Sequence, residues 1–209
     1  LFQTATRLYT SANTHNGIFV GTGSGYTISG NTIGYANASG TGTTNLIGNS
    51  LILAGFPASY VTAGAATATR YIAINGAFTA AGTNSNVKSN TIAGFALHTS
   101  SGAATTNGVF AGINITAGNA TIGGANSSDG NIIGTTTGPA SGSYSIFVSS
   151  TTAGAVVSPV YATSANTVSI QNNKIGDIMT TGTSGATASG FKGIDVAGAG
   201  RISITDNVI

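Results

Sequence analysis

The stretch Thr-Ile-Ser-Gly-Asn-Thr-Ile-Gly at residues 27–34 returns late in the chain as Val-Ser-Ile-Gln-Asn-Asn-Lys-Ile-Gly at residues 168–176. Both contain an asparagine, any one residue and then an isoleucine. This Asn-x-Ile element occurs five times, and successive asparagines are 59, 41, 42 and 34 residues apart. The asparagines are Asn31, Asn90, Asn131, Asn173 and Asn207, and the isoleucines are Ile33, Ile92, Ile133, Ile175 and Ile209. A recurring tripeptide indicates a protein built from repeated structural units.

A second apolar segment precedes each Asn-x-Ile element. These segments lie at 17–20, 71–74, 108–111, 159–161 and 193–196. An apolar residue also stands three positions before four of the five asparagines, and Ser128 is the exception. In the last unit, strands are expected at 173–178, 191–196 and 201–206, with turns of unequal length between them. Three short strands per unit with variable loops predict one rung, or turn, of a parallel β-solenoid.

The composition favours strands and nearly excludes helices. Ile outnumbers Leu by 21 to 6, and the 32 glycines punctuate stretches rich in Thr, Val, Ser and Asn. We therefore predict an all-β fold in which residues 1–209 form a single β-solenoid segment, with equivalent side chains stacked about 4.8 Å apart. A β-sandwich is the alternative, but a sandwich does not require the same tripeptide five times. Because neither end of the sequence has a clear polar cap, we expect the segment to belong to a longer repeat protein.

The repeated asparagines are expected to stand at one corner of every rung. A sharp bend between strands needs a residue that tolerates positive φ, and Asn does so better than other non-glycine residues. Stacked amide side chains also hydrogen-bond from one strand to the next. The five asparagines therefore predict a structural ladder. The five isoleucines, two positions later, predict a column inside the core.

The two quoted stretches resemble the right-handed parallel β-helix repeats of pectin-lyase-like proteins. More narrowly, they are similar to the large, low-charge repeat proteins that Bacteroidota secrete to their surface, some of which form gliding or adhesion filaments. The likeness covers most of the chain. It implies a secreted, extracellular protein of the bacterial cell surface, with a structural or adhesin role. The implied partners are neighbouring repeats of the same chain, other copies of it and surface glycans.

Charge and cysteine content exclude several classes of function. Charged residues make up 5% of the chain and the net charge is +2, so the clustered cations of a nucleic-acid-binding protein are missing. No apolar run approaches the roughly 20 residues of a membrane-spanning helix. The absence of cysteine removes disulfides, thiolate-ligated zinc and thiol catalysis.

Few residues are suited to catalysis. Enzymes with this fold usually cleave acidic polysaccharides with clustered carboxylates, whereas the whole supply here is Asp129, Asp177, Asp195 and Asp206. His15 and His98 are expected in surface loops, and no nucleophile-elbow motif accompanies them. We therefore predict no catalytic residue, no metal ligand and no cofactor, and expect that this segment is not an enzyme.

Three functions stay open at this point. The first is a structural or adhesive segment of a cell-surface filament, and the second is a carbohydrate-active β-helix, polysaccharide-binding or lyase-like, whose active rungs lie elsewhere. The third is an ice-binding solenoid with a flat threonine array, for which the available pairs are 41/43, 67/69 and 181/183.

Loop aromatics either stack on sugar rings or fold back onto the rungs. They are Tyr35, Phe56, Tyr60 and Tyr144.

Overall fold

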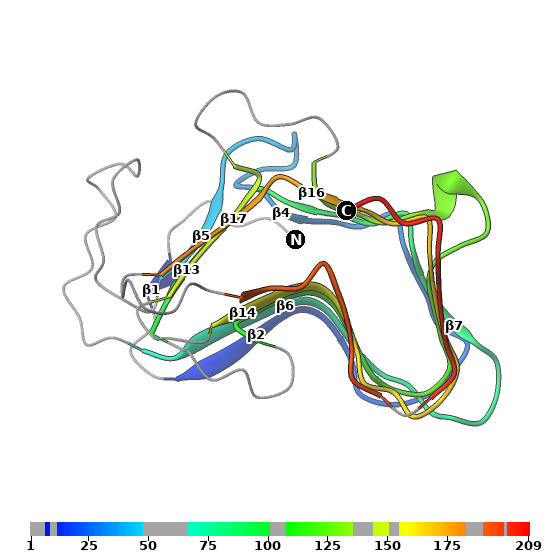
Figure 1. Cartoon of the computed structure of the whole chain (residues 1–209). Helices are drawn as coiled ribbons and strands as arrows, with labels where there is room; N and C mark the ends of the chain where they lie inside the picture. Colours follow the sequence, from blue (N-terminus) through cyan, green and yellow to red (C-terminus); the bar gives the residue numbers. More distant parts are fainter. Residues whose placement is uncertain are drawn as a thin grey trace.

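A computed structural model of the chain describes residues 7–8, 12–47, 67–100, 108–135, 144–150, 155–182, 190–198 and 200–209. In these ranges the regular structure is almost entirely strand, and one short 3-10 helix, η2 (Ser127–Asp129), interrupts it. All pairings between the described strands are parallel. The chain is an all-β parallel β-helix, as predicted, and its rungs wind around one core (Figure 1).

The strands form four sheets, and each sheet collects one strand from successive rungs. Sheet B contains β2 (Asn13–Val20), β6 (Thr69–Ala77), β10 (Phe110–Ala117), β14 (Val156–Ala162), β18 (Gly190–Phe191) and β19 (Ile194–Val196). Sheet C contains β3 (Thr27–Ser29), β7 (Ser85–Lys88), β11 (Ala120–Gly123), β15 (Val168–Gln171) and β20 (Ile202–Thr205). Sheet D contains β4 (Thr32–Gly34), β8 (Thr91–Ala93), β12 (Ile132–Gly134) and β16 (Lys174–Gly176). Sheet A contains β1 (Arg7–Leu8), β5 (Thr44–Ile47), β9 (Phe95–Thr99), β13 (Ile146–Ser150) and β17 (Ile178–Gly182).

The three predicted strands per rung account for four sheets because the third strand is divided by a bend. One residue of positive φ separates β8 from β9 and β16 from β17: Gly94 with φ +66° and Asp177 with φ +57°. In the first and third rungs a longer segment replaces this single residue, between β4 and β5 and between β12 and β13. Sheets D and A are therefore two parts of one side of the solenoid (Figure 1).

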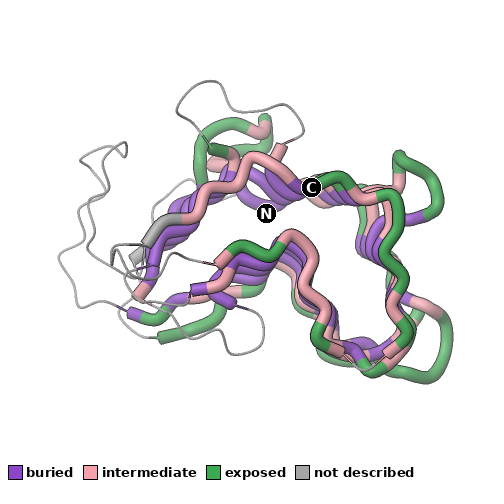
Figure 2. The backbone as a smooth tube through the Cα atoms, in the orientation of Figure 1, coloured by how far each residue is buried: buried purple, intermediate pink, exposed green. Residues whose placement is uncertain are grey.

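The predicted isoleucine column fills the middle of the core in four rungs. Cα registers align Ile33 with Ile92, Ile92 with Ile133 and Ile133 with Ile175, and all four side chains are buried. Ile209 continues this column, since the adjacent Val208 pairs with Lys174, but Ile209 is 67% exposed, so its predicted place inside the core is wrong. Ile209 still lies against Gly193, as Ile33 lies against Gly17. It is exposed because no strand of the described residues packs on the outer side of its rung (Figure 2).

Two details of the predicted repeat are wrong in the third rung. Ser128 lies in η2, and the apolar position of its rung is taken by Ile122, which aligns with Val87 and Ile170. Residues 124–130 form an insertion before the asparagine, so counting back three positions misses the strand. In sheet B the third-rung partner of Ile74 is Ile113, so the apolar segment lies further along than 108–111.

Candidate functional site

The five predicted ladder asparagines meet at the corner between sheets C and D. In the first four of them, the side-chain Nδ2 donates a hydrogen bond to the Oδ1 of the asparagine in the next rung. The Nδ2–Oδ1 distances are 2.9 Å for Asn31–Asn90, 2.9 Å for Asn90–Asn131, 2.8 Å for Asn131–Asn173 and 2.9 Å for Asn173–Asn207. The amides of the three middle members are buried. One continuous line of amides therefore runs through five rungs.

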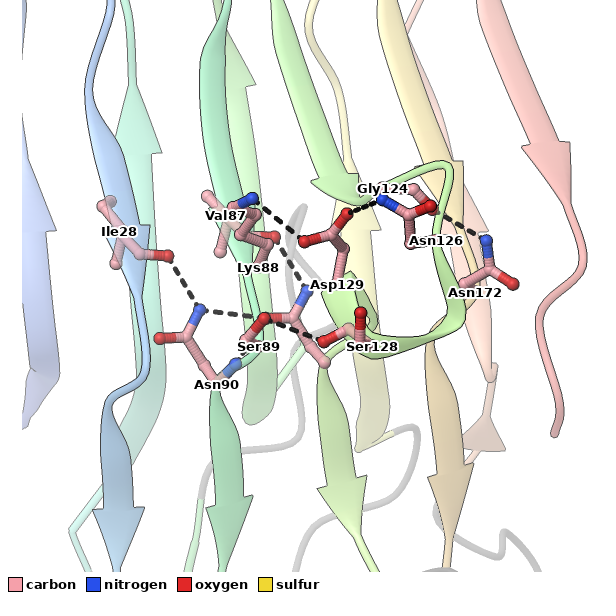
Figure 3. Close-up of polar contacts among 11 residues, drawn as sticks. Ile28, Val87, Lys88, Ser89, Asn90, Gly124, Asn126, Ser128, Asp129 and Asn172 are labelled. Carbon is pink, nitrogen blue, oxygen red and sulfur yellow. Dashed lines mark hydrogen bonds and ion pairs between the residues drawn. The ribbon is translucent and has the colours of Figure 1, made fainter.

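Every ladder amide also binds the backbone of its neighbours. The backbone N–H of Asn90 donates to Asn131 Oδ1 at 3.1 Å, and the second Nδ2 hydrogen of Asn90 reaches Ile28 O at 2.9 Å (Figure 3). The same pair of contacts recurs at Asn131 and Asn173. An amide offers two donors and two acceptor positions, and here all four are used. Each middle asparagine therefore joins three successive rungs.

Of the two reasons expected for asparagine at this corner, the amide hydrogen bonds are present but the tolerance of positive φ is wrong. The ladder residues are not among the non-glycine residues with positive φ. In four rungs the left-handed residue is instead the one just before the asparagine, namely Gly30, Ser89, Asn172 and Asp206, with φ between +54° and +68°. In the third rung the preceding residue, Gly130, is extended, with φ −62°. Asparagine stands at this corner for the hydrogen bonds of its amide, and in four of the five rungs the residue before it takes the left-handed backbone conformation.

The insertion of the third rung closes over this corner. Lys88 Nζ and Asp129 Oδ1 form an ion pair at 2.9 Å, and Asn126 Nδ2 donates to Asp129 Oδ2 at 3.1 Å (Figure 3). These hydrogen bonds, that of Lys88 first, lower the pKa of the Asp129 carboxyl below its ordinary value. On the far side, Asn172 Nδ2 donates to Gly124 O at 2.7 Å. The insertion thereby ties together the second, third and fourth rungs.

Two further carboxylates, those of Asp177 and Asp195, are engaged at separate places. Asp177 Oδ2 accepts hydrogen bonds from Thr135 Oγ1 at 3.0 Å and from Ser145 N at 2.9 Å, at the bend between sheets D and A. Asp195 lies on sheet B and pairs with Lys192 Nζ at 2.8 Å, which raises the pKa of that lysine. In the described part of the chain, no group of three or more His, Cys, Asp or Glu side chains could hold a metal ion.

Both histidines lie in strands, so their predicted placement in loops is wrong. His15 belongs to β2 and is half-buried. His98 belongs to β9, its side chain is only 4% exposed, and its ring lies 5.5 Å from the ring of Phe147. Burial lowers the pKa of His98 from 6.5 to about 4. The alternation of Phe95, Leu97 and Thr99 around it was the available sign of a strand.

A second amide ladder, not predicted from the sequence, runs along sheet B. Asn75 Nδ2 donates to Asn16 Oδ1 at 2.9 Å, and Asn114 Nδ2 donates to Asn75 Oδ1 at 2.8 Å. The signal that could have revealed it is the Ile-Asn pair shared by 74–75 and 113–114. Its three amides add further contacts between the first three rungs.

The loop aromatics, for which stacking on sugars and packing on the rungs were both left open, and the threonine pairs lie only partly in the described residues. Tyr35 is half-buried against Gly94, and Tyr144 is exposed before β13. Phe56 and Tyr60 lie outside the described residues. The 41/43 pair is exposed but the 67/69 pair is buried, and position 183 lies outside the described residues.

No protein-family model, no curated protein and no solved structure matches the chain. The parallel β-helix architecture agrees with the noted resemblance, whereas these comparisons give no support to a pectin-lyase-like or Bacteroidota assignment. In the residues that the structure describes, no helix has the length and apolar character needed to cross a membrane.

Proposed function

We propose that this chain is a structural and adhesive segment of an extracellular repeat protein of the bacterial cell surface. The observation that supports the proposal is the buried asparagine ladder, which links five rungs without a break. Together with the parallel sheets, it joins each rung to the next at several places around the coil. Such a stack is suited to a stiff spacer that holds its loops away from the cell.

The chemistry of the surface fits an exterior role. Two ion pairs are present in the described residues, and the contacts between rungs are mainly backbone and amide hydrogen bonds. Salt screens exposed charges but has little effect on such neutral hydrogen bonds. The partners in this proposal are neighbouring repeats or further copies, arranged as in the secreted filaments of Bacteroidota that the sequence resembles.

The proposal is tested by labelling cells that produce the protein. Antibodies raised against this segment are expected to bind intact cells as strongly as permeabilised ones. An antibody against a cytosolic protein serves as the control, and it should bind only after permeabilisation. Labelling of our segment that also requires permeabilisation would contradict the surface role.

A mechanical measurement tests the spacer role independently. Pulled from both ends by force spectroscopy, the chain is expected to resist extension and then unfold in steps of one rung. The Asn131→Ala variant should unfold at a lower force, because Asn131 joins three successive rungs. Extension of the unaltered chain at low force, as for an unfolded polymer, would contradict a spacer.

The enzyme and ice-binding alternatives make different predictions. Cleavage of pectin or alginate that is lost in Asp177→Asn or Asp195→Asn would replace the structural proposal with a catalytic one. Thermal hysteresis of a chain solution would do the same for ice binding. We expect neither result from this segment.

A further inference from the structure

Two exposed aromatic rings flank one glycine-rich loop, residues 21–25, at the corner between sheets B and C. Phe19, near the end of β2, is 63% exposed, and Tyr26, just before β3, is 40% exposed. A Cβ added at Gly21 would lie 3.2 Å from the ring of Phe19, and one at Gly23 would lie 2.5 Å from the hydroxyl of Tyr26. The glycines therefore allow both rings to fold over the backbone of the loop between them.

This loop is held in place by the second rung. Gly23 N donates to Thr79 Oγ1 at 2.9 Å, and Thr79 N donates back to Gly23 O at 2.6 Å. Gly25 N donates to Thr83 O at 2.9 Å. Tyr26 also packs against the buried ring of Phe78, with 6.1 Å between the ring centroids. A surface that is already ordered loses little conformational entropy when a ligand binds.

The groups around the rings are polar but uncharged. The hydroxyls of Thr22 and Thr79 lie 3.4 Å apart beside the loop. On the other side, Phe19 is aligned with Asn75 in sheet B, next to the exposed Asn16–Asn75 hydrogen bond. Residues 16–34 and 75–87, which supply this corner, contain no Asp, Glu, Lys or Arg.

We propose that this corner binds a neutral oligosaccharide. The apolar face of a sugar ring stacks on an aromatic ring, while its hydroxyls exchange hydrogen bonds with threonine and asparagine side chains. Phosphates, nucleic acids and acidic glycans require cations, which the corner lacks. The inference rests on the proposed adhesive role and gives it a ligand class.

Binding is tested on the purified chain by saturation-transfer NMR and titration. The probes are cellohexaose, chitohexaose and mannohexaose, with hexagalacturonate as the acidic comparison. At least one neutral probe is expected to bind and to receive saturation from aromatic protons. Phe19→Ala should weaken that binding by about tenfold or more, and Phe19→Tyr, which keeps a ring, should restore most of it.

Phe191 provides the matched control, because it is an exposed phenylalanine of the same sheet, in β18. Phe191→Ala should leave the affinity unchanged. The inference is overturned if no neutral probe binds, if hexagalacturonate binds as tightly, or if Phe191→Ala loses as much affinity as Phe19→Ala. These outcomes are separate from the cell-labelling and force experiments, because a chain that binds no sugar can still be a surface spacer.

Discussion

At the scale of single residues, the three middle ladder asparagines use every hydrogen-bonding position of their amides. Asn173 is fully buried, its Oδ1 accepts from both N and Nδ2 of Asn131, and its Nδ2 donates to Asn207 and Ile122. Removing such a side chain leaves buried donors without acceptors, which costs more than the net value of the lost hydrogen bonds.

We expect Asn173→Ala to lower the free energy of unfolding by about 1 to 3 kcal/mol, measured by urea denaturation. The control is Asn86→Ala, because Asn86 is the outward-facing residue next to buried Val87 in β7 and does not belong to the ladder. Its loss should be within about 0.5 kcal/mol. Equal losses in the two variants would contradict a special role for the ladder.

The buried His98 gives stability a dependence on pH. Its pKa is about 4 in the folded chain and 6.5 without burial, so between these values the unfolded chain binds more protons. Stability is therefore greatest above pH 6.5, falls as the pH drops toward 4, and loses about 3 kcal/mol over that interval.

Urea midpoints measured at pH 7.5 and pH 4.5 check this expectation. His98→Gln, which cannot take up a proton, should remove most of the difference between the two midpoints. A pH dependence that is unchanged in His98→Gln would assign the effect to other groups.

The sequence identified some of these residues better than others. The ladder and the column were predictable because a fixed Asn-x-Ile spacing survives loops of any length. The burial of His98 was not predictable. A single polar residue in a short strand produces no repeating sequence pattern, and its burial depends on the packing around sheet A. The outermost isoleucine was misplaced because a repeat pattern does not reveal which rung is left uncovered.

At the scale of elements, the bends between strands bring glycines against the backbone of the next rung. Gly134 has φ +89°, and a Cβ there would lie 1.7 Å from Gly176 O. Gly30 also has positive φ, +68°, but a Cβ there would meet nothing within 4 Å. Substitutions at Gly30 and Gly134 therefore separate the loss of stability caused by a left-handed backbone from the loss caused by a steric clash.

We expect Gly30→Ala to cost about 1 to 2 kcal/mol, because only the left-handed backbone is disfavoured. Gly134→Ala should cost more than about 3 kcal/mol, since the rungs must also move apart. Thermal and urea unfolding of both variants provide the comparison. Similar losses would mean that contact between rungs at this bend is looser than described.

Three strands per rung were predictable from the spacing of apolar segments, but the fourth sheet was not. The bend at Gly94 and Asp177 is a single residue, and a single residue leaves no gap in the apolar pattern. The insertion at 124–130 was also missed, because it separates the asparagine from the strand that stands three positions before it in the other rungs. Loops of variable length have no repeating pattern. The alignment of the strands on either side of such a loop is therefore known only from the strand pairing in the structure.

At the scale of the whole molecule, the last described rung has an apolar surface. Its exposed large side chains include Phe191, Ile204, Val208 and Ile209, and they accompany the unpaired edges of β19 and β20. Exposed strand edges next to apolar side chains favour association with other chains.

Sedimentation of this 209-residue chain is therefore expected to show association that grows with concentration. The double variant Ile204→Lys and Val208→Lys should suppress it, because charge on this edge opposes pairing. Phe19→Lys, which changes an exposed residue far along the stack, should not. Association that survives the double variant would place the contact on another surface.

The asparagine ladder has a direction, since each of its three middle amides donates to the following rung and accepts from the preceding one. A gene that gains or loses the codons of one whole rung keeps this polarity intact at the new junction. A gain or loss of only part of a rung breaks it, because the corner amides on the two sides of the junction then no longer face each other. Recombination between copies of the repeat can therefore change the reach of the protein while preserving its fold.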